Sequence, residues 1–245
     1  MDALIVIPAR YASTRLPGKP LLAETGKPMI QHTYERAAAT GAQVLVATDD
    51  ARIADAVRGF GGEAVMTRAD HETGSARVAE AAADRRTGVI VNLQGDEPEV
   101  EPEAIGRLID LHAAASRSDR PAFISTLVSD FREDADPASP DAVKAVLSVP
   151  DAHGVRSALW FSRALIPHRR ARAAAPLLHI GLYAYSPASL AKLGDLAPTP
   201  AEQAESLEQL RVLEHGHRIA AAVVPPAAPG IDTPEDYAAF VARTR

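Results

Sequence analysis

Short apolar runs alternate with helix-like segments along the first third of the chain, and this rhythm restricts the possible folds more than any other feature. Strand-length runs recur over residues 3–7, 44–48, 63–67 and 89–93. Helix-like segments separate them, over residues 28–40, 51–60 and 75–86. The first run is apolar at every position, which is typical of a strand buried on both faces. The β-α-β-α order therefore predicts an α/β fold with a doubly wound, mostly parallel sheet.

The pattern changes after a further helix expected near residues 102–115. Strand-like segments then follow one another over residues 123–129, 143–149, 156–162 and 179–186. They indicate a small mixed or antiparallel sheet grafted onto the parallel one. Residues 164–178 are rich in Arg, Ala and Pro and are interpreted as a mobile loop. The chain is expected to close with a helix near 201–215, a strand at 218–224 and a helix from about Thr233.

A chain of 245 residues fits one large domain with a subdomain inside it. The sequence contains no internal repeat. We expect residues 1–115 to form the parallel-sheet part, residues from about 120 to 186 the mixed-sheet subdomain, and residues 187–245 to return to the main sheet.

Composition excludes several classes of function. The 26 basic and 32 acidic residues leave a net charge of −6, and aromatic residues make up only 4%. Neither value suits a protein that binds nucleic acid by charge and base stacking. The absence of cysteine rules out disulfides, thiolate metal sites and a cysteine nucleophile. Apolar runs are too short for a membrane span, and no basic segment precedes the first one, so we expect a soluble intracellular protein.

A basic loop directly follows the first predicted strand. Residues 8–20 contain Arg10, Arg15 and Lys19 and no acidic residue, although the chain is acidic overall. In sheets of this kind, ligands bind outside the carboxyl ends of the strands. Converging cations and backbone donors at such a point suit a polyphosphate. Neither the Walker loop nor the dinucleotide fingerprint is present, and a solvated basic loop is the alternative interpretation.

Two acidic positions lie where strands are expected to end. Gln94-Gly95-Asp96-Glu97-Pro98 follows the run at 89–93, and Asp232 precedes the last helix. Asp96 and Asp232 together suit Mg²⁺, which usually takes one or two carboxylates and completes its shell with water and phosphates. Gly95 permits a close approach of the backbone to a ligand. The alternatives are an ordinary acidic turn for Asp96 and a helix cap for Asp232.

Eight sequence blocks occur in an order that is specific when they are taken together. They are PARYASTRLPGKPL, RADHETGSARVAE, VNLQGDEP, DAVKAVL, WFSRALIP, HIGLYAY, ESLEQLRVLEHG and IDTPEDY. With them the chain closely resembles the 3-deoxy-manno-octulosonate (Kdo) cytidylyltransferases, or CMP-Kdo synthetases. The resemblance implies a nucleotide-diphospho-sugar transferase-like, Rossmann-like fold. It also implies that CTP and Kdo react with Mg²⁺ to give CMP-Kdo and pyrophosphate for lipopolysaccharide assembly, in a cytoplasmic homodimer formed through the mixed-sheet subdomain.

The resemblance also implies roles for individual residues. Arg10, Lys19 and Asp96 match the catalytic positions, and Asp96 and Asp232 match the metal ligands. The nucleotide site matches Pro8, Ala9, Arg10, Ser13, Lys19, Gly74, Ser75 and Arg77. The sugar pocket matches Gln94, Arg163, His179, Tyr183, Glu208 and Gln209.

The local pattern around the sugar residues agrees with this assignment. In a strand over 179–186, His179, Gly181 and Tyr183 share one face, and the glycine leaves room between the two rings. A strand histidine is more often structural than catalytic, and its possible roles here are acid, base or donor. In a helix over 201–215, the stripe of Leu207, Leu210 and Leu213 is expected to be buried, with Glu208 and Gln209 beside it at the core's edge.

The chain departs from the family pattern at Ala76, at His168-Arg169 and at Leu178, so other functions stay open. The nearest is a cytidylyltransferase for another acid sugar, such as 8-amino-Kdo or a nonulosonate. A glycosyltransferase using a nucleotide sugar, with Asp96-Glu97 as its metal motif, is more distant. A non-catalytic nucleotide-binding regulator would not need both Asp96 and Asp232.

Overall fold

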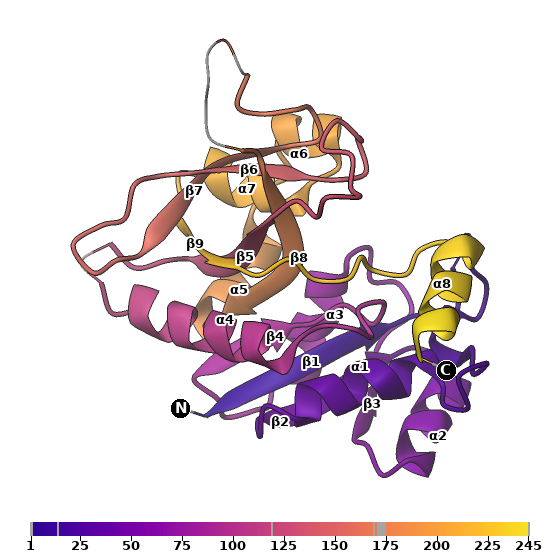
Figure 1. Cartoon of the computed structure of the whole chain (residues 1–245). Coiled ribbons are helices and arrows are strands. Elements are labelled where there is room, and N and C mark those ends of the chain that lie inside the picture. Colours follow the sequence, from indigo (N-terminus) through magenta and orange to yellow (C-terminus); the bar gives the residue numbers. More distant parts are fainter. Residues whose placement is uncertain (1, 14, 119, 169, 171–174, 245) are drawn as a thin grey trace. The chain divides into compact units, whose positions relative to one another are not determined.

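The structure is a computed structural model of the 245-residue chain, which describes every residue except 1, 14, 119, 169, 171–174 and 245 (Figure 1). The chain divides into two compact units. The first unit comprises Met1–Gly106 and Ala227–Arg245, and the second comprises Arg107–Pro226. Each unit is described by itself.

The first unit is built on a parallel sheet whose strands lie in the order β3-β2-β1-β4. The strands are β1 (Ala3–Ala9), β2 (Gln43–Thr48), β3 (Ala64–Met66) and β4 (Val89–Asn92). Almost every residue of β1, β2 and β4 is buried, as the continuous apolar runs predict. The helices of this unit are α1 (Met29–Ala38), α2 (Ala51–Gly59), α3 (Gly74–Ala82) and α8 (Pro234–Thr244), with a 3₁₀ turn η1 (Lys19–Leu21).

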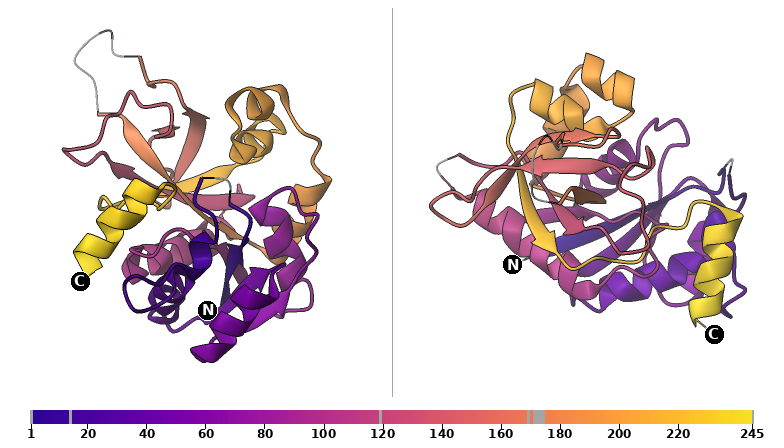
Figure 2. Two further views of the ribbon diagram at one scale, coloured as in Figure 1. Left: turned by 90° about the vertical axis from the view of Figure 1, so that its right-hand side faces the viewer. Right: turned by 45° about the horizontal axis from the view of Figure 1, so that its top comes forward.

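Polar side chains cap the first turns of two helices in this unit, α2 and α3. Asp50, shortly after β2, accepts a hydrogen bond from the Arg52 backbone N–H at 2.9 Å and starts α2. Thr73 accepts from the Ala76 N–H at 3.2 Å and starts α3. Such caps satisfy N–H groups that the helix itself leaves unpaired. The N-termini of α2 and α3 follow β2 and β3, and so lie towards the carboxyl edge of the sheet, where the basic loop follows β1 (Figure 2).

The second unit contains a mixed sheet in the order β8-β5-β9-β7-β6. Its strands are β5 (Ile124–Asp130), β6 (Lys144–Leu147), β7 (Arg156–Ser162), β8 (Leu177–Tyr185) and β9 (Ile219–Val224). Only the β5–β9 pairing among these is parallel, and an additional β6–β8 pairing closes the strands into a ring. Its helices are α5 (Pro187–Asp195), α6 (Pro200–Glu205), α7 (Glu208–Glu214) and most of α4 (Pro102–Ala115).

The predicted fold class is confirmed: a doubly wound parallel sheet is followed by a mixed sheet. One predicted helix was wrong, because residues 201–215 form two helices rather than one. Ser206 between them has φ 52° and ψ 50°, the left-handed conformation, which ends α6. The sequence analysis also missed α5, whose start Ser186-Pro187 carries a capping box with Ser189.

Two predictions concerned longer segments, namely the return of residues 187–245 to the main sheet and a loop over residues 164–178. Residues 187–226 belong to the second unit, where β9 pairs with β5 and β7, and only Ala227–Arg245 joins the first unit. The loop expected over 164–178 ends at β8, which begins at Leu177, and part of it lies outside the described residues.

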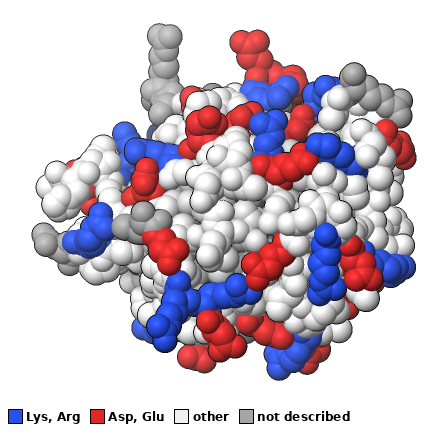
Figure 3. Space-filling model, turned by 90° about the horizontal axis from the view of Figure 1, so that it is seen from below, with Lys and Arg blue, Asp and Glu red and all other residues white. Residues whose placement is uncertain are grey.

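Charged side chains of both signs are interspersed on the face drawn in Figure 3. Described surface ion pairs include Arg85–Glu63 and Arg243–Glu99, each at 2.6 Å. Exposed pairs of this kind contribute at most about 1 kcal/mol each, so the apolar strands carry most of the stability. Among the described residues, none of the helices is long and apolar enough to span a membrane.

Candidate active site

A cavity of about 410 Å³ opens in the first unit at the carboxyl ends of β1 and β4. Residues predicted for the nucleotide line it, namely Pro8, Ala9, Arg10, Ser13, Lys19, Gly74 and Arg77. Gln94, Asp96 and Asp232, predicted for sugar and metal, line it too. Ser75 is buried at the start of α3 and is not among the lining residues. Arg15 of the basic loop and Gly95 also line the cavity, together with four residues that the sequence did not single out, Ala12, Pro20, Met29 and Glu72.

The basic loop folds back on itself around Tyr11. Gly18 has φ 68°, a left-handed conformation that glycine adopts without steric cost, and its N–H donates to the Tyr11 carbonyl at 3.3 Å. A Cβ at position 18 would lie 3.3 Å from the Tyr11 ring. On α2, the Arg52 guanidinium lies 3.4 Å from the centroid of the same ring. These contacts tie Gly18 to Tyr11, and Lys19 comes directly after the glycine turn.

Arg10 is held by the segment between β3 and α3. Its guanidinium donates to the carbonyl oxygen of His71. The buried His71 ring contacts the carboxylate of Glu80 on α3, and this contact lowers the pKa of Glu80. Glu80 also accepts from the Arg68 backbone N–H at 3.2 Å. Arg10 is therefore positioned by a carbonyl whose own residue is tied to α3, a relation that the sequence does not reveal.

Lys19 joins the two predicted metal ligands. Its Nζ lies 2.8 Å from Asp96 Oδ2 and 3.2 Å from Asp232 Oδ1, and it also donates to the Ile231 carbonyl at 2.8 Å. The sequence analysis assigned Lys19 to the triphosphate, whereas in the structure its ammonium is paired with both carboxylates. Arg15 adds a contact of 3.1 Å to Asp232.

Asp232 is not the cap of the last helix. Thr233 Oγ1 accepts from the Asp236 N–H at 3.2 Å, and the Asp236 carboxylate accepts from the N–H groups of Asp232 and Thr233. This reciprocal pair satisfies the start of α8. The carboxylate of Asp232 is therefore left to face Lys19 and Arg15.

Glu97 is a third acid at this point, and the sequence analysis gave it no role in the predicted metal pair. Burial, together with the nearby carboxylates of Asp96 and Asp232, raises the pKa of Glu97 to about 8, against the opposing effect of Lys19. A Cβ at Gly230 would lie 3.3 Å from Glu97 Oε1, so the glycine leaves space for this side chain. The sequence feature that could have pointed to Glu97 was its position directly after Asp96.

The residues present fit a divalent cation held by two carboxylates. Asp96 and Asp232 both lie within 3.2 Å of one ammonium nitrogen, so a single cationic centre can contact both. Within the described part of the chain, no three His, Asp or Glu side chains are arranged to hold a metal. A cation here would take the rest of its ligands from water or phosphate, as Mg²⁺ usually does.

Gly95 allows a close approach, but to the backbone rather than to a ligand. A Cβ at this position would lie 3.1 Å from the Pro8 carbonyl oxygen of β1. The Gly95 carbonyl accepts from Thr33 Oγ1 on α1 at 3.2 Å. The glycine therefore packs the end of β4 tightly against the end of β1 beneath the cavity.

Arg77 lines the cavity, but its guanidinium serves the fold. The side chain is fully buried and donates to Asp49 Oδ2 at 2.9 Å and to Thr67 Oγ1 at 2.5 Å. Asp49 follows β2 and Thr67 follows β3, so this residue of α3 braces the ends of two strands. Its Nε has no hydrogen-bond partner among the described residues.

In the second unit, His179 and Tyr183 of β8 lie together as predicted, with ring centroids 5.5 Å apart. Phe161 of β7 packs edge-on against His179 at 4.8 Å. Burial lowers the pKa of His179 to about 3 and raises that of Tyr183 well above 10, with smaller contributions to Tyr183 from Tyr185 and then Glu208. Both rings are therefore neutral near pH 7. Thr126 of β5, which the sequence analysis did not select, contacts His179 Nε2 at 3.0 Å.

Arg163 is held by the end of α6. Its backbone N–H donates to Glu205 Oε2 at 2.6 Å, and its Nε donates to the Glu205 carbonyl at 2.7 Å. Nη1 donates to the Pro140 carbonyl at 2.9 Å. The predicted neighbours Glu208 and Gln209 lie in the first turn of α7, where Gln209 is buried rather than at the edge of the core.

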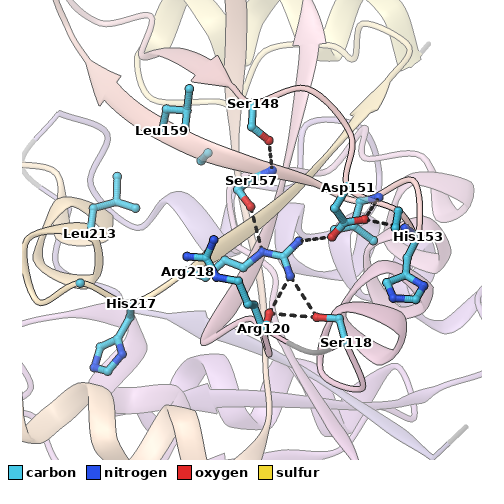
Figure 4. Close-up of a pocket in the computed structure, with 14 residues that line it drawn as sticks. Ser118, Arg120, Ser148, Asp151, His153, Ser157, Leu159, Leu213, His217 and Arg218 are labelled. Carbon is cyan, nitrogen blue, oxygen red and sulfur yellow. Dashed lines mark hydrogen bonds and ion pairs between the residues drawn. The ribbon is translucent and has the colours of Figure 1, made fainter.

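A second cavity, of about 460 Å³, lies within the second unit (Figure 4). Its principal cation, Arg218, donates to Ser157 Oγ at 2.8 Å, to the Arg120 carbonyl at 2.6 Å and to Asp151 Oδ2 at 2.8 Å. Ser118 Oγ accepts a further bond at 3.0 Å. Because these polar groups satisfy one another, we assign this cavity a structural role in joining the ends of α4, β7 and β9.

Comparison with known proteins identifies the family. A family model described as Cytidylyltransferase matches residues 4–219. The 3-deoxy-manno-octulosonate cytidylyltransferase of Syntrophobacter fumaroxidans is 48% identical over 244 residues, covering 96% of this chain and 94% of the relative. The protein of the same name from Escherichia coli is 46% identical over 235 residues, covering 95% and 92%.

Solved structures agree. The structure of CMP:2-keto-3-deoxy-manno-octonic acid synthetase complexed with CTP has a TM-score of 0.90 to this chain at 43% identity, and covers 99% of this chain and 98% of that one. The inositol-1-phosphate CTP transferase of T. maritima has a TM-score of 0.65 at 13% identity, covering 100% and 96%, which shows a shared fold alone. From the family model and from relatives close to half identical over nearly their whole length, the chain belongs to the 3-deoxy-manno-octulosonate cytidylyltransferase family.

Proposed function

We propose that this chain transfers CMP from CTP to the anomeric hydroxyl of Kdo and releases pyrophosphate. The observation that carries the proposal is the cavity of the first unit, where Arg10 and Lys19 gather beside Asp96 and Asp232. Cations suit a triphosphate, and a pair of carboxylates suits the divalent cation that accompanies it. Family membership supports CTP as the nucleotide and Kdo as the acceptor.

In this proposal the first unit binds the nucleotide. Arg10 and Lys19 contact the phosphates, with Ser13 beside them in the same loop. The backbone of Pro8 and Ala9 at the end of β1 reads the cytosine. The turn at the start of α3 completes the site, with Gly74 lining the cavity and with Ser75 and Arg77 supporting it from buried positions.

Asp96 and Asp232 would hold Mg²⁺. When bound, it would supply charge neutralisation at the α-phosphate and a lowered pKa for the attacking hydroxyl. Asp96 is placed by the tight packing of Gly95 under β1, and Asp232 by its release from the capping of α8. Lys19 places its amino group next to both carboxylates.

In the second unit, the acid sugar would be bound by Arg163, His179, Tyr183, Glu208 and Gln209. The guanidinium of Arg163 suits the sugar carboxylate, because its planar donors match two carboxylate oxygens at once. Glu208 and Gln209 suit hydroxyl groups as hydrogen-bond partners. Buried polar groups of this kind reject a wrong sugar, since it would leave them unpaired.

The transfer itself needs little covalent work from the protein. The anomeric oxygen forms a bond to the α-phosphorus while the bond to the pyrophosphate oxygen breaks in line, and the hydroxyl proton is lost to solvent. Positioning of the two substrates and stabilisation of charge on the leaving pyrophosphate by Arg10 and Lys19 supply the rate. We assign no residue as a general base.

We further propose that the chain acts in the cytoplasm as a homodimer through the second unit. Large apolar side chains there are exposed in the single chain, including Val149 at 81%, Leu159 at 56% and Val223 at 47%. A second copy of the chain would remove them from water. Sedimentation of the wild type and of Leu159→Glu tests this, because only the wild type should sediment as a dimer.

The experiment that tests the reaction is release of pyrophosphate from CTP and Mg²⁺ with each candidate sugar in parallel. We expect Kdo to give the highest kcat/KM, ahead of 8-amino-Kdo and a nonulosonate. Assays without sugar and with Asp96→Asn serve as controls. A preference for the nonulosonate would overturn Kdo as the substrate but leave cytidylyl transfer intact, whereas no pyrophosphate with any sugar would overturn the transfer.

A further inference from the structure

Thr126 is a fully buried residue of β5 whose hydroxyl meets three polar groups. Its Oγ1 lies 2.8 Å from the Leu182 carbonyl oxygen, 3.0 Å from His179 Nε2 and 3.2 Å from the Ile180 carbonyl oxygen. All three partners belong to β8, the strand that carries His179 and Tyr183.

The contacts of Thr126 determine which atom donates to which. A hydroxyl has one hydrogen and two lone pairs, and a carbonyl oxygen can only accept. The hydrogen of Thr126 is therefore directed to the carbonyls, of which Leu182 is the nearer. Its oxygen is then left to accept, so the contact with His179 requires a hydrogen on Nε2.

The surroundings of the His179 ring complete the argument. Phe161 and Tyr183 flank the ring, and the low pKa of His179 keeps it neutral near pH 7. A neutral imidazole carries one hydrogen, so a hydrogen on Nε2 leaves a lone pair on Nδ1. The partner of one ring nitrogen thus decides what the other can do.

We infer that Thr126 is a positioning residue that holds His179 as the Nε2–H tautomer, so that Nδ1 accepts a hydrogen bond from a hydroxyl group of the acid sugar. The acceptor role rests on the proposed function, while the tautomer does not. The sequence left three roles open for His179, namely acid, base or donor. A bare Nδ1 carries no hydrogen, so the inference excludes the roles of acid and donor at that nitrogen.

The same hydroxyl also stabilises an irregularity in β8. Thr126 pairs with Tyr183 and the next residue, Leu127, pairs with Ile180, so Gly181 and Leu182 are extra residues in a bulge. Thr126 bonds the carbonyls on both sides of Gly181. Because two residues rather than one are inserted, His179 and Tyr183 stay on the same face of the strand.

The test uses the full chain labelled with ¹⁵N-histidine. Two-bond ¹H–¹⁵N spectra near neutral pH distinguish a protonated ring nitrogen from a bare one, and the His179 signals are those missing in His179→Gln. We expect the wild type and Thr126→Ser to carry the hydrogen on Nε2. Thr126→Val, which has the same shape without the hydroxyl, should show a mixture of tautomers. A wild-type His179 ring that carries its hydrogen on Nδ1 would overturn the inference, whatever the enzyme activity. Because this outcome is measured on the wild type, it decides the inference even if Thr126→Val fails to fold.

Kinetics test the acceptor role separately. Thr126→Val should raise the KM for Kdo about tenfold, the effect of one well-placed hydrogen bond, and leave the KM for CTP nearly unchanged. Thr126→Ser should restore the wild-type KM. An unchanged KM for Kdo in Thr126→Val, with the tautomer lost, would overturn the acceptor role. If Kdo is not a substrate at all, the proposed function fails while the spectra still decide the tautomer.

Discussion

Lys19 is the residue on which the charges of the candidate site converge. Its Nζ is within 3.2 Å of two carboxylates that lie 77 and 213 residues away in the sequence. With its side chain only 14% exposed, the ammonium is held in place rather than free in solvent. The function of this cation, of the acids beside it and of Arg163 can each be tested by one substitution.

Replacing Lys19 by alanine removes the charge that we assign to the leaving phosphates. We expect turnover to fall by roughly 10²-fold, the size of effect seen when one charge-stabilising donor is lost. Steady-state pyrophosphate release measures it. Lys27→Ala is the matched control, because Lys27 is half exposed and pairs with Glu35 on the surface. Near-normal turnover in a folded Lys19→Ala protein would remove this residue from the mechanism.

Replacing Asp232 by asparagine keeps its shape and removes one anionic ligand. We expect a higher Mg²⁺ concentration for half-maximal activity and an intact fold, because Thr233 and Asp236 already cap α8. A Mg²⁺ titration of activity measures the shift. Asp134→Asn, at an exposed carboxylate paired with Arg132, is the control. If the two titration curves coincide with that of the wild type, Asp232 is not a metal ligand.

Replacing Arg163 by lysine keeps the charge but loses the planar fork. The donors to the Glu205 and Pro140 carbonyls would be lost, and paired contact with the sugar carboxylate would be lost with them. We expect kcat/KM for Kdo to fall by about tenfold or more with little change in the KM for CTP. Arg132→Lys is the surface control. An equal loss for both substrates would contradict a specific role at the sugar.

At the scale of elements, the joint between α6 and α7 decides where two predicted sugar ligands lie. Ser206 adopts the left-handed conformation there, and Glu205 just before it holds Arg163. Glu208 and Gln209 begin α7 two residues later. Arg163 directly follows β7 and is held by Glu205. The joint therefore links this arginine to the first turn of α7 through one short segment.

Substitutions at Ser206 test that joint. Left-handed backbone costs an L-residue about 1 kcal/mol or more, a cost that glycine does not carry and that a β-branched residue increases. Ser206→Gly should therefore leave the free energy of unfolding unchanged or slightly higher, and Ser206→Val should lower it by about 1–2 kcal/mol. Urea unfolding measures both. Equal stabilities for the two variants would contradict a left-handed Ser206.

At the scale of the whole molecule, stability near neutral pH depends on histidines kept neutral by burial. His112 of α4 is 1% exposed, its Nδ1 is paired with Ser125 Oγ at 2.9 Å, and burial lowers its pKa to about 4. His179 in the same unit is shifted in the same direction. In the unfolded chain a histidine has a pKa near 6.5. Below that pH it binds a proton that the buried ring of the folded chain does not bind.

Stability should therefore fall as the pH drops from about 6.5 towards 4. For His112 the full shift corresponds to about 3 kcal/mol, which is present above pH 6.5 and lost progressively below it. Urea unfolding of the wild type and His112→Gln at about pH 7.5 and about pH 4.5 measures it. The variant should show the shallower pH dependence, whatever its own stability. Parallel pH profiles would contradict a buried neutral His112.

The order of the strands in the sequence was predictable, because burial on both faces leaves a continuous apolar run that the sequence displays directly. The break at Ser206 was not, since helix-forming residues surround it and no glycine or proline marks its left-handed conformation in the sequence. The positions of Arg10 and Asp96 just after β1 and β4 were predictable, because parallel strands present their carboxyl ends at one edge.

By itself, the sequence determined the fold class, the family and the residue types gathered at the ligand edge of the sheet. Only the tertiary structure decided their partners: Arg10 with the His71 carbonyl, Lys19 with Asp96 and Asp232, and Arg77 with Asp49. Strand and helix formation follows from periodicity within a few residues. A side-chain contact between segments up to 213 residues apart depends instead on how the packed elements bring those segments together.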